Sequence, residues 1–162
     1  MLPYSAPPEF AHSVTQATCR ACPSSELLTI LDLGSSPLAD QLYRPDRLPA
    51  HDLTFPLRLV FCPTCALVQI TENVAPRLLY GDDYPYYTSV SSEAVAHFTA
   101  AAEAILARKA LGRDSLVVEA ASNDGYQLKV FRKAGVRVLG VDPAPGPARV
   151  ANAAGIETLC RF

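Results

Sequence analysis

Four of the five cysteines stand in two close pairs, and their spacing is that of a zinc site. Cys19 and Cys22 lie in the segment CRAC, and Cys62 and Cys65 lie in CPTC. A CxxC pair places two thiolates on one tight turn, so that both sulfur atoms face one point, and two such pairs complete a tetrahedral shell around Zn²⁺. Because four thiolates leave no open position for water, we predict a structural zinc ion and not a hydrolytic one.

The segment between the two pairs is longer than the usual loop of a zinc ribbon, but the cost of closing a loop grows only logarithmically with its length. Reduced core thiols and a redox dithiol are the alternatives. A redox motif needs one CxxC at the start of a helix that follows a strand, and neither pair is so placed. Cys160 stands apart in an expected strand and is predicted to be a small core residue.

A second group of polar residues lies where an expected strand meets an expected helix. The segment VVEAASNDGY carries Glu119 in the strand and the turn Ser122–Gly125 after it. In parallel α/β sheets, ligands bind beyond the carboxyl ends of the strands. Asp142 ends the next expected strand, where a carboxylate can accept both hydroxyls of a ribose. These residues predict a site for a nucleoside-containing cofactor.

The composition of this turn separates the classes of cofactor. A pyrophosphate loop requires G-x-G-x-x-G, whereas this turn offers Gly125 beside Asn123 and Asp124. An acidic turn that is poor in glycine suits a cofactor with a cationic or zwitterionic group, which argues against an NAD-dependent oxidoreductase. An ordinary turn, in which Asp124 caps the amino terminus of the helix, remains the alternative.

The elements that must position these residues follow from the apolar pattern. Leu57–Phe61 and Leu67–Thr71 are short apolar runs between turns, typical of a small metal-stapled β-rich unit. A helical period runs from residue 92 to 111, with Ser91 or Ser92 as N-cap and Gly112 just past its end.

The last fifty or so residues alternate between strand and helix patterns. We expect a strand at SLVVEAA, a turn at SNDG, a helix at YQLKVFRKAG, a strand at VRVLGVD, a loop at PAPGP, a helix at ARVANAAG and a strand at IETLC. This βαβαβ order predicts a parallel, doubly wound sheet with right-handed crossovers. The expected fold class is therefore α/β, a small zinc-binding β-rich domain followed by the first half of a Rossmann-like domain.

Four parts are expected along the chain: a flexible leader (1–17), the zinc-binding domain (18–75), a link rich in Tyr and Ser (76–91) and the partial Rossmann-like domain (92–162).

The amino terminus MLPYSAPPEFAHS lacks the basic start and apolar core of a secretory signal. No apolar run is long enough to span a bilayer. We therefore expect a cytoplasmic protein with no membrane partner, in a compartment where paired thiols favour metal over disulfide.

Six segments carry a resemblance to a known family. In order along the chain they are CRAC, LDLGSSPLAD, FPLRLVFCPTCALVQI, YPYYTSVSSEAVAHF, VVEAASNDGYQLKVF and GVDPAPGPARVANAAGIETL. Together they closely resemble the zinc-containing, S-adenosylmethionine-dependent C-methyltransferases, several of which methylate ring carbons of nucleotide-linked deoxysugars. The resemblance runs from about Cys19 to Phe162. The paired cysteines together with E-A-A-S-N-D-G-Y make it specific.

The resemblance implies a role for each residue of the second group. Glu119 and the turn Ser122–Gly125 would contact the methionine end of the cofactor, Asp142 would hold its ribose, and Pro143 would lie beside the adenine. The link would reach over the active site, with Tyr86 as the candidate catalytic residue and Ser89 touching cofactor or substrate. Packing is the alternative for the link, since tyrosines between domains are commonly interface anchors.

The resemblance also implies that this chain is the front portion of such an enzyme, because the residues credited with deprotonating the substrate lie farther along in family members. We expect this portion to be inactive alone. The strand Leu116–Ala121 would lack a partner on one edge, so that self-association through that edge, or partial disorder after about Gly112, is expected.

A zinc-ribbon module that recruits a protein or a nucleic acid is the alternative function. The net charge of −2, with the 14 basic residues dispersed as single positions, argues against a nucleic-acid partner. The resemblance implies a small-molecule substrate instead, such as a nucleotide-linked sugar. The appended βαβαβ pattern argues against a ribbon that works alone. A salt-dependent gel shift would distinguish the two functions.

Overall fold

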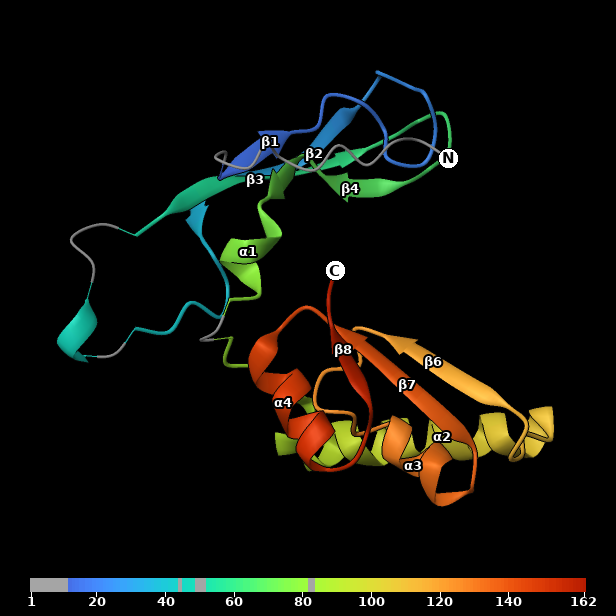
Figure 1. Ribbon diagram of the computed structural model, residues 1–162. Helices are drawn as coiled ribbons and strands as arrows, with labels where there is room; N and C mark the ends of the chain where they lie inside the picture. The colour runs from blue at the N-terminus through green and yellow to red at the C-terminus, as the bar shows by residue number, and fades with distance from the viewer. Residues whose placement is uncertain (1–11, 44, 49–51, 82–83) are drawn as a thin grey trace. The chain divides into compact units, whose positions relative to one another are not determined.

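The computed structural model describes residues 12–43, 45–48, 52–81 and 84–162 (Figure 1). The chain divides into two compact units, Met1–Leu79 and Tyr80–Phe162. The first unit is β-rich, and the second alternates between strands and helices. The predicted class, a β-rich cysteine-bearing region followed by a parallel sheet with helices, is confirmed.

The first unit is built from antiparallel strands. Its larger sheet has the order β2-β3-β4, and β1 pairs with β5 in a second, two-stranded sheet. In chain order the elements are β1 (Ser13–Thr15), β2 (Leu28–Pro37), the 3₁₀ turn η1 (Pro45–Arg47), β3 (Thr54–Phe61), β4 (Val68–Ile70), β5 (Glu72–Val74) and the short helix α1 (Pro76–Leu79).

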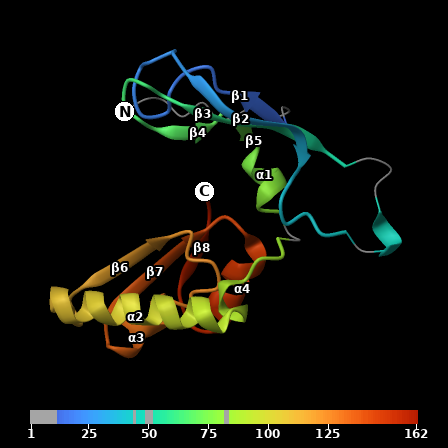
Figure 2. The ribbon, with the colours of Figure 1, turned by 180° about the vertical axis from the view of Figure 1, so that it is seen from behind.

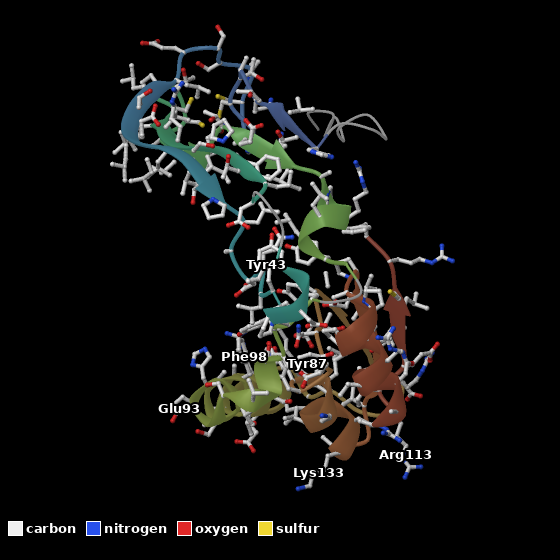
Figure 3. All side chains as sticks on the ribbon, turned by 90° about the vertical axis from the view of Figure 1, so that its left-hand side faces the viewer. Tyr43, Tyr87, Glu93, Phe98, Arg113 and Lys133 are labelled. Carbon is white, nitrogen blue, oxygen red and sulfur yellow. The ribbon has the colours of Figure 1, made fainter. Side chains whose placement is uncertain are left out.

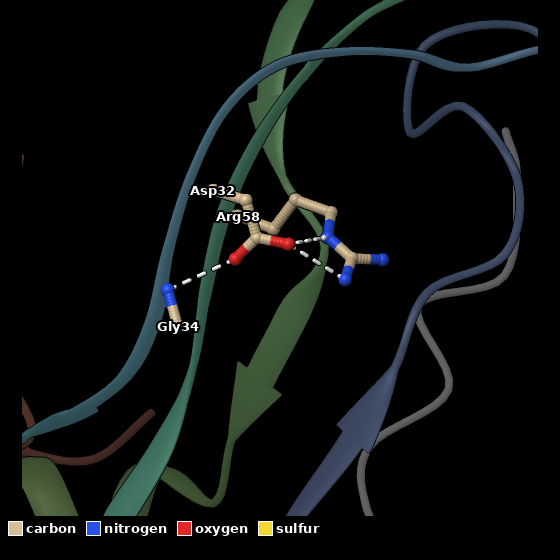
Figure 4. A network of polar contacts seen from close by, with 3 residues as sticks. All are labelled: Asp32, Gly34 and Arg58. Atoms are coloured by element: carbon tan, nitrogen blue, oxygen red, sulfur yellow. Dashed lines mark hydrogen bonds and ion pairs between the residues drawn. The ribbon is translucent and has the colours of Figure 1, made fainter.

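Strand β2 is irregular, and an ion pair with β3 fixes its bend (Figure 4). The register shifts between Asp32 and Ser35, where Gly34 adopts a left-handed φ of 69°. The Asp32 carboxylate accepts a hydrogen bond from the Gly34 amide at 2.9 Å and another from Arg58 Nε at 2.8 Å. The Gly34 amide and the Arg58 guanidinium together lower the pKa of Asp32. The glycine supplies the backbone conformation, and the carboxylate holds the two strands together across the irregularity.

The second unit is a three-stranded parallel sheet of order β6-β7-β8 with helices on one face, as Figures 1 and 2 show. Its elements are η2 (Thr88–Val90), α2 (Ser92–Lys109), β6 (Leu116–Ala120), α3 (Leu128–Lys133), β7 (Arg137–Asp142), α4 (Pro145–Ala153) and β8 (Thr158–Cys160). The buried core joins the three helices to the ends of the strands through Ala102, Leu128, Phe131, Val136, Ala151 and Ile156.

The other face of this sheet is apolar and open to solvent. Along β6, Val117 packs against the core, whereas Leu116 and Val118 point the other way and are 50% and 55% exposed. Of the strands in the described residues, β6 pairs with β7 alone. In a doubly wound sheet the first strand is central and helices cover both faces. The unit therefore has the architecture of one half of such a sheet.

Several expected element boundaries are wrong. Ser13–Thr15 of the expected flexible leader forms β1 and pairs with Glu72–Val74, a partner so distant in sequence that no local pattern signals it. Residues 1–11 of that leader lie outside the described residues. Helix α4 begins at Pro145, inside the expected loop, because a proline in the first turn needs no amide hydrogen. Helix α2 does start after Ser91, but its left-handed C-cap is Ala110 and not Gly112.

Cys160 was expected in the core, and this expectation is also wrong. It ends β8 at the edge of the sheet, where its side chain is exposed. No helix in the described parts of the chain has the length and apolar character needed to cross a bilayer.

Candidate metal centre and cofactor site

The four paired cysteines converge at one point of the first unit. Their sulfur atoms all lie within 4.8 Å of one another. Cys19 and Cys65 approach to 3.5 Å and Cys22 and Cys62 to 3.6 Å between sulfurs. Four thiolates at the usual Zn–S distance would lie about 3.8 Å apart along each edge of the tetrahedron. The cluster is therefore of the size that one zinc ion requires.

Tight turns at the ends of strands position the two pairs. Cys62 follows β3 directly, and its amide donates to the Leu67 carbonyl at 2.9 Å while its carbonyl accepts from Ala66 at 2.8 Å. Ala66 takes a left-handed φ of 61° to close this turn. In the first pair, the Cys19 amide donates to the Ser24 carbonyl at 2.9 Å. These backbone bonds close both turns.

Gln69 of β4 joins the two cysteine turns, and sequence reasoning missed it. Its side chain is buried, its Oε1 accepts from the Arg20 amide at 2.9 Å, and its Nε2 donates to the Thr18 carbonyl at 3.3 Å. The amide therefore holds the first turn against the strand that follows the second. The sequence did contain a sign of this role, because a polar glutamine stands within the apolar run Leu67–Thr71.

Backbone amides around the cluster favour thiolates. The Ala21 amide donates to Cys19 Sγ at 3.4 Å and is the main cause that lowers the pKa of Cys19. Burial raises the pKa of Cys62, but the Cys65 and Thr64 amides and the neighbouring thiols outweigh it and lower this pKa to about 6. Burial and hydrogen bonds with the other thiols raise the pKa of Cys22 to about 12, and hydrogen bonds with other thiols and burial raise that of Cys65. The metal-free cluster thus favours thiolates at Cys19 and Cys62, and zinc, which binds the thiolate form, must displace the protons of Cys22 and Cys65.

The cofactor turn connects β6 to α3 through an unusual backbone. Ala121, Asn123 and Gly125 all have left-handed φ values, of 58°, 50° and 73°. Gly125 is favoured for a second reason, because a Cβ there would lie 3.1 Å from Ile156 Cβ and 3.3 Å from Ala151 Cβ, which is tighter than ordinary contact. Ser122 packs over Gly140 of β7, where a Cβ would lie 2.5 Å from its Oγ. The turn is therefore packed closely against the core.

This turn holds buried oxygen atoms that lack hydrogen-bond partners among the described residues: Glu119 Oε2, Ser122 Oγ, and both carboxylate oxygens of Asp124. Asp124 and Ser122 are both fully buried. Burial also raises the pKa of Glu119 to about 7. The alternative in which Asp124 caps α3 is wrong, since the helix begins after Gln127 and has no side-chain cap. Carboxylates without donors suit a cationic group.

Asp142 lies where the sequence placed it, at the end of β7, but it already has backbone partners. Its Oδ2 accepts from the Asn123 amide at 2.8 Å and its Oδ1 from the Ala144 amide at 2.9 Å. The residue is 4% exposed. A carboxylate has about four acceptor sites, so the two bonds leave capacity for a ribose. Asp142 therefore links the turn after β6 to the turn after β7, with or without a bound ligand.

The tyrosine-rich link contacts the same turn through its main chain. Asn123 Oδ1 accepts from the Thr88 amide at 2.9 Å, and Asn123 Nδ2 donates to the Tyr86 carbonyl at 3.1 Å. Tyr86 is 47% exposed, and Ser89 is exposed as well. Tyr87, labelled in Figure 3, places its hydroxyl 2.6 Å from where a Cβ of Gly146 would lie.

Tyr126 is a second residue of the site that the sequence did not single out. Its ring lies 4.8 Å from that of Phe98, between centroids. Burial, and then the nearby Glu119 charge, raise the pKa of Tyr126, while the Thr88 side chain lowers it in part. The structure therefore brings Glu119, the turn and Asp142 together, with the link fastened beside them.

Comparison with known proteins agrees with this geometry. Residues 19–80 match the protein family described as "Putative zinc binding domain". Over 141 residues the chain is 37% identical to the C-methyltransferase NovU of Streptomyces niveus, a match that covers 87% of this chain and 33% of NovU. The chain thus spans about a third of the length of this relative, and the predicted resemblance to the zinc-containing C-methyltransferases is confirmed.

Removal of one thiol tests the metal centre. We predict about one zinc ion per chain in the native protein and a loss of zinc, with unfolding of the first unit, in Cys62→Ser, because metal binding and folding are coupled in so small a unit. Cys160→Ser is the matched control, since this thiol is exposed and outside the cluster. Metal analysis of freshly purified, reduced protein measures the outcome, and a zinc-free native chain would contradict it.

Paired glycine substitutions test the packing of the cofactor turn. Gly125→Ala and Gly135→Ala both force alanine into a left-handed φ, of 73° and 82°, but nothing lies within 4 Å of a Cβ at Gly135. We expect Gly125→Ala to lower the free energy of unfolding by about 1–3 kcal/mol more than Gly135→Ala, because it adds overpacking to the same backbone strain. Urea unfolding measures the difference, and equal losses would show that the turn is not closely packed.

Proposed function

We propose that this chain carries the zinc module and the first half of the cofactor site of an S-adenosylmethionine-dependent C-methyltransferase. The observation that carries the proposal is the buried carboxylate of Asp124, which has no donor among the described residues. Glu119, whose pKa is raised to about 7 by burial, precedes the same turn. The cofactor has a sulfonium and an ammonium group, and a turn with buried acceptor oxygens suits both. The similarity to a C-methyltransferase supports the same conclusion.

In this proposal each residue has a binding or positioning task. The turn Ser122–Gly125 and Glu119 hold the methionine end, Asp142 and Pro143 bind the nucleoside end, and the link presents Tyr86 and Ser89 toward cofactor and substrate. S-adenosylmethionine supplies the reactive methyl group on its sulfonium. The four cysteines form a closed structural zinc site that takes no part in the chemistry.

The proposed substrate is a nucleotide-linked deoxysugar or a similar keto compound, whose carbon becomes a nucleophile when a proton next to the carbonyl is removed. The chain positions the methyl donor against that carbon, and orientation of this kind contributes much of the rate in such transfers. We propose that these residues alone are inactive, that the protein is cytoplasmic, and that β6 offers an open edge for self-association.

Calorimetry with a charge-neutral variant tests the cofactor. We expect S-adenosylmethionine to bind the native chain and NAD not to bind it, and we expect Asp124→Asn to weaken binding by about ten- to a hundredfold, through loss of one charge-assisted contact. Asp142→Ala would be ambiguous, because that carboxylate also holds two backbone amides.

Glu157→Gln is the matched control for Asp124→Asn. Glu157 is exposed and precedes β8, so that it lies at the amino end of the strands, away from the turn. It should leave cofactor affinity unchanged. Binding of NAD in place of the sulfonium cofactor, or equal effects of the two variants, would reverse the proposal.

A further inference from the structure

Both polar atoms of the Asn123 side chain bond the tyrosine-rich link. Its oxygen accepts from the Thr88 amide at 2.9 Å, and its nitrogen donates to the Tyr86 carbonyl at 3.1 Å. Asn123 is 7% exposed and Thr88 5%. The two bonds enclose one stretch of main chain, so the amide clamps residues 86–88 against the cofactor turn.

Few side chains could perform this task. The clamp needs a donor and an acceptor on one short planar group, and a carboxylate or a hydroxyl supplies no such pair at fixed spacing. The residue must also tolerate its left-handed φ of 50°, which asparagine does better than most residues. Because the Asn123 amide hydrogen bonds Asp142 Oδ2 at 2.8 Å, one residue joins the link, the β6 turn and the end of β7.

Neighbouring contacts fasten the same stretch of the link. The Thr88 carbonyl accepts from the Ser91 amide at 3.2 Å. Tyr87 packs over Gly146 of α4, where any larger residue would meet its hydroxyl. The Tyr86 side chain, between these anchors, remains 47% exposed. The link is therefore held by its backbone and by Tyr87 while Tyr86 stays free to contact a ligand.

We propose that Asn123 is a positioning residue, which fixes the backbone of Tyr86 and Thr88 on the cofactor turn and does not itself bind the cofactor. This differs from the direct contact that the family resemblance implied for Asn123, and it narrows the cofactor contact proposed above for the turn Ser122–Gly125 to the other residues of that turn. The presentation of Tyr86 to a bound ligand rests on the proposed function, whereas the clamp itself exists without any ligand.

Amide hydrogen exchange on the ligand-free full chain tests the clamp. Asn123→Gly keeps the left-handed backbone but removes both bonds, and we expect the Thr88 amide to exchange about tenfold faster. Asn123→Asp keeps an acceptor for Thr88 and loses the donor to Tyr86, so that most of the protection at Thr88 should remain. Ala121→Gly is the control, because Ala121 has a φ of 58° in the same turn and is exposed. Unchanged exchange at Thr88 in Asn123→Gly would overturn the proposal.

Calorimetric titration with S-adenosylmethionine tests the consequence for Tyr86. We expect Tyr86→Ala and Asn123→Gly each to weaken binding, and the double variant to be no weaker than the more affected single one, since both remove the same positioned ring. Additive losses would show that Asn123 contacts the cofactor directly and would overturn the positioning role. If the native chain does not bind this cofactor, the proposed function fails, while the exchange experiment still decides the clamp.

Discussion

Carboxylate oxygens that are buried without donors impose the strongest constraint on the second unit. The Asp124 side chain is fully buried, and neither of its oxygens has a partner among the described residues. Leaving such a group unpaired costs free energy that a small domain can offset only through packing elsewhere or through a ligand. The surrounding turn is arranged to keep those oxygens in place: three residues take left-handed φ values, and Gly125 leaves room for Ile156. A turn built at such conformational cost is typical of a binding site.

The first unit depends on a different interaction. Among its described residues the buried apolar side chains are few, namely Phe55, Val60 and Ala75 besides Cys19 and Cys62, while Leu28, Ile30 and Leu33 are about half exposed. Such a core cannot offset the loss of chain entropy alone, and a structural metal is the usual remedy. Zinc at the cysteine cluster would tie the start of the unit to the β3–β4 hairpin, with Gln69 joining the same two segments. Metal binding and folding are then one event in this unit.

The sequence predicted features that local chemistry dictates. Two CxxC pairs can converge on one ion whatever the fold between them, and a βαβαβ pattern leaves few arrangements of a parallel sheet. Strands β1 and β2 were not predicted, because neither shows a clear alternation of apolar and polar residues. Strand β1 is only three residues long, and β2 is interrupted by Gly34 and mostly exposed. The roles of Asn123 and Gln69 depend on backbone atoms that lie far away in the sequence, at Tyr86 and Thr18. Contacts of this kind leave no periodic pattern in the sequence from which they could be predicted.

The central claim is that the acceptor-lined turn after β6 receives a cation, and proton release on binding tests it most directly. Glu119, with its pKa raised to about 7, is mostly protonated in the free protein at pH 6. A bound cation favours the ionised carboxylate, so S-adenosylmethionine should displace the proton, and its affinity should fall as the pH drops below 7. Calorimetry at pH 6 in buffers of different ionisation enthalpy should therefore show proton release that Glu119→Gln abolishes. Binding without proton release, or with proton uptake, would contradict the account.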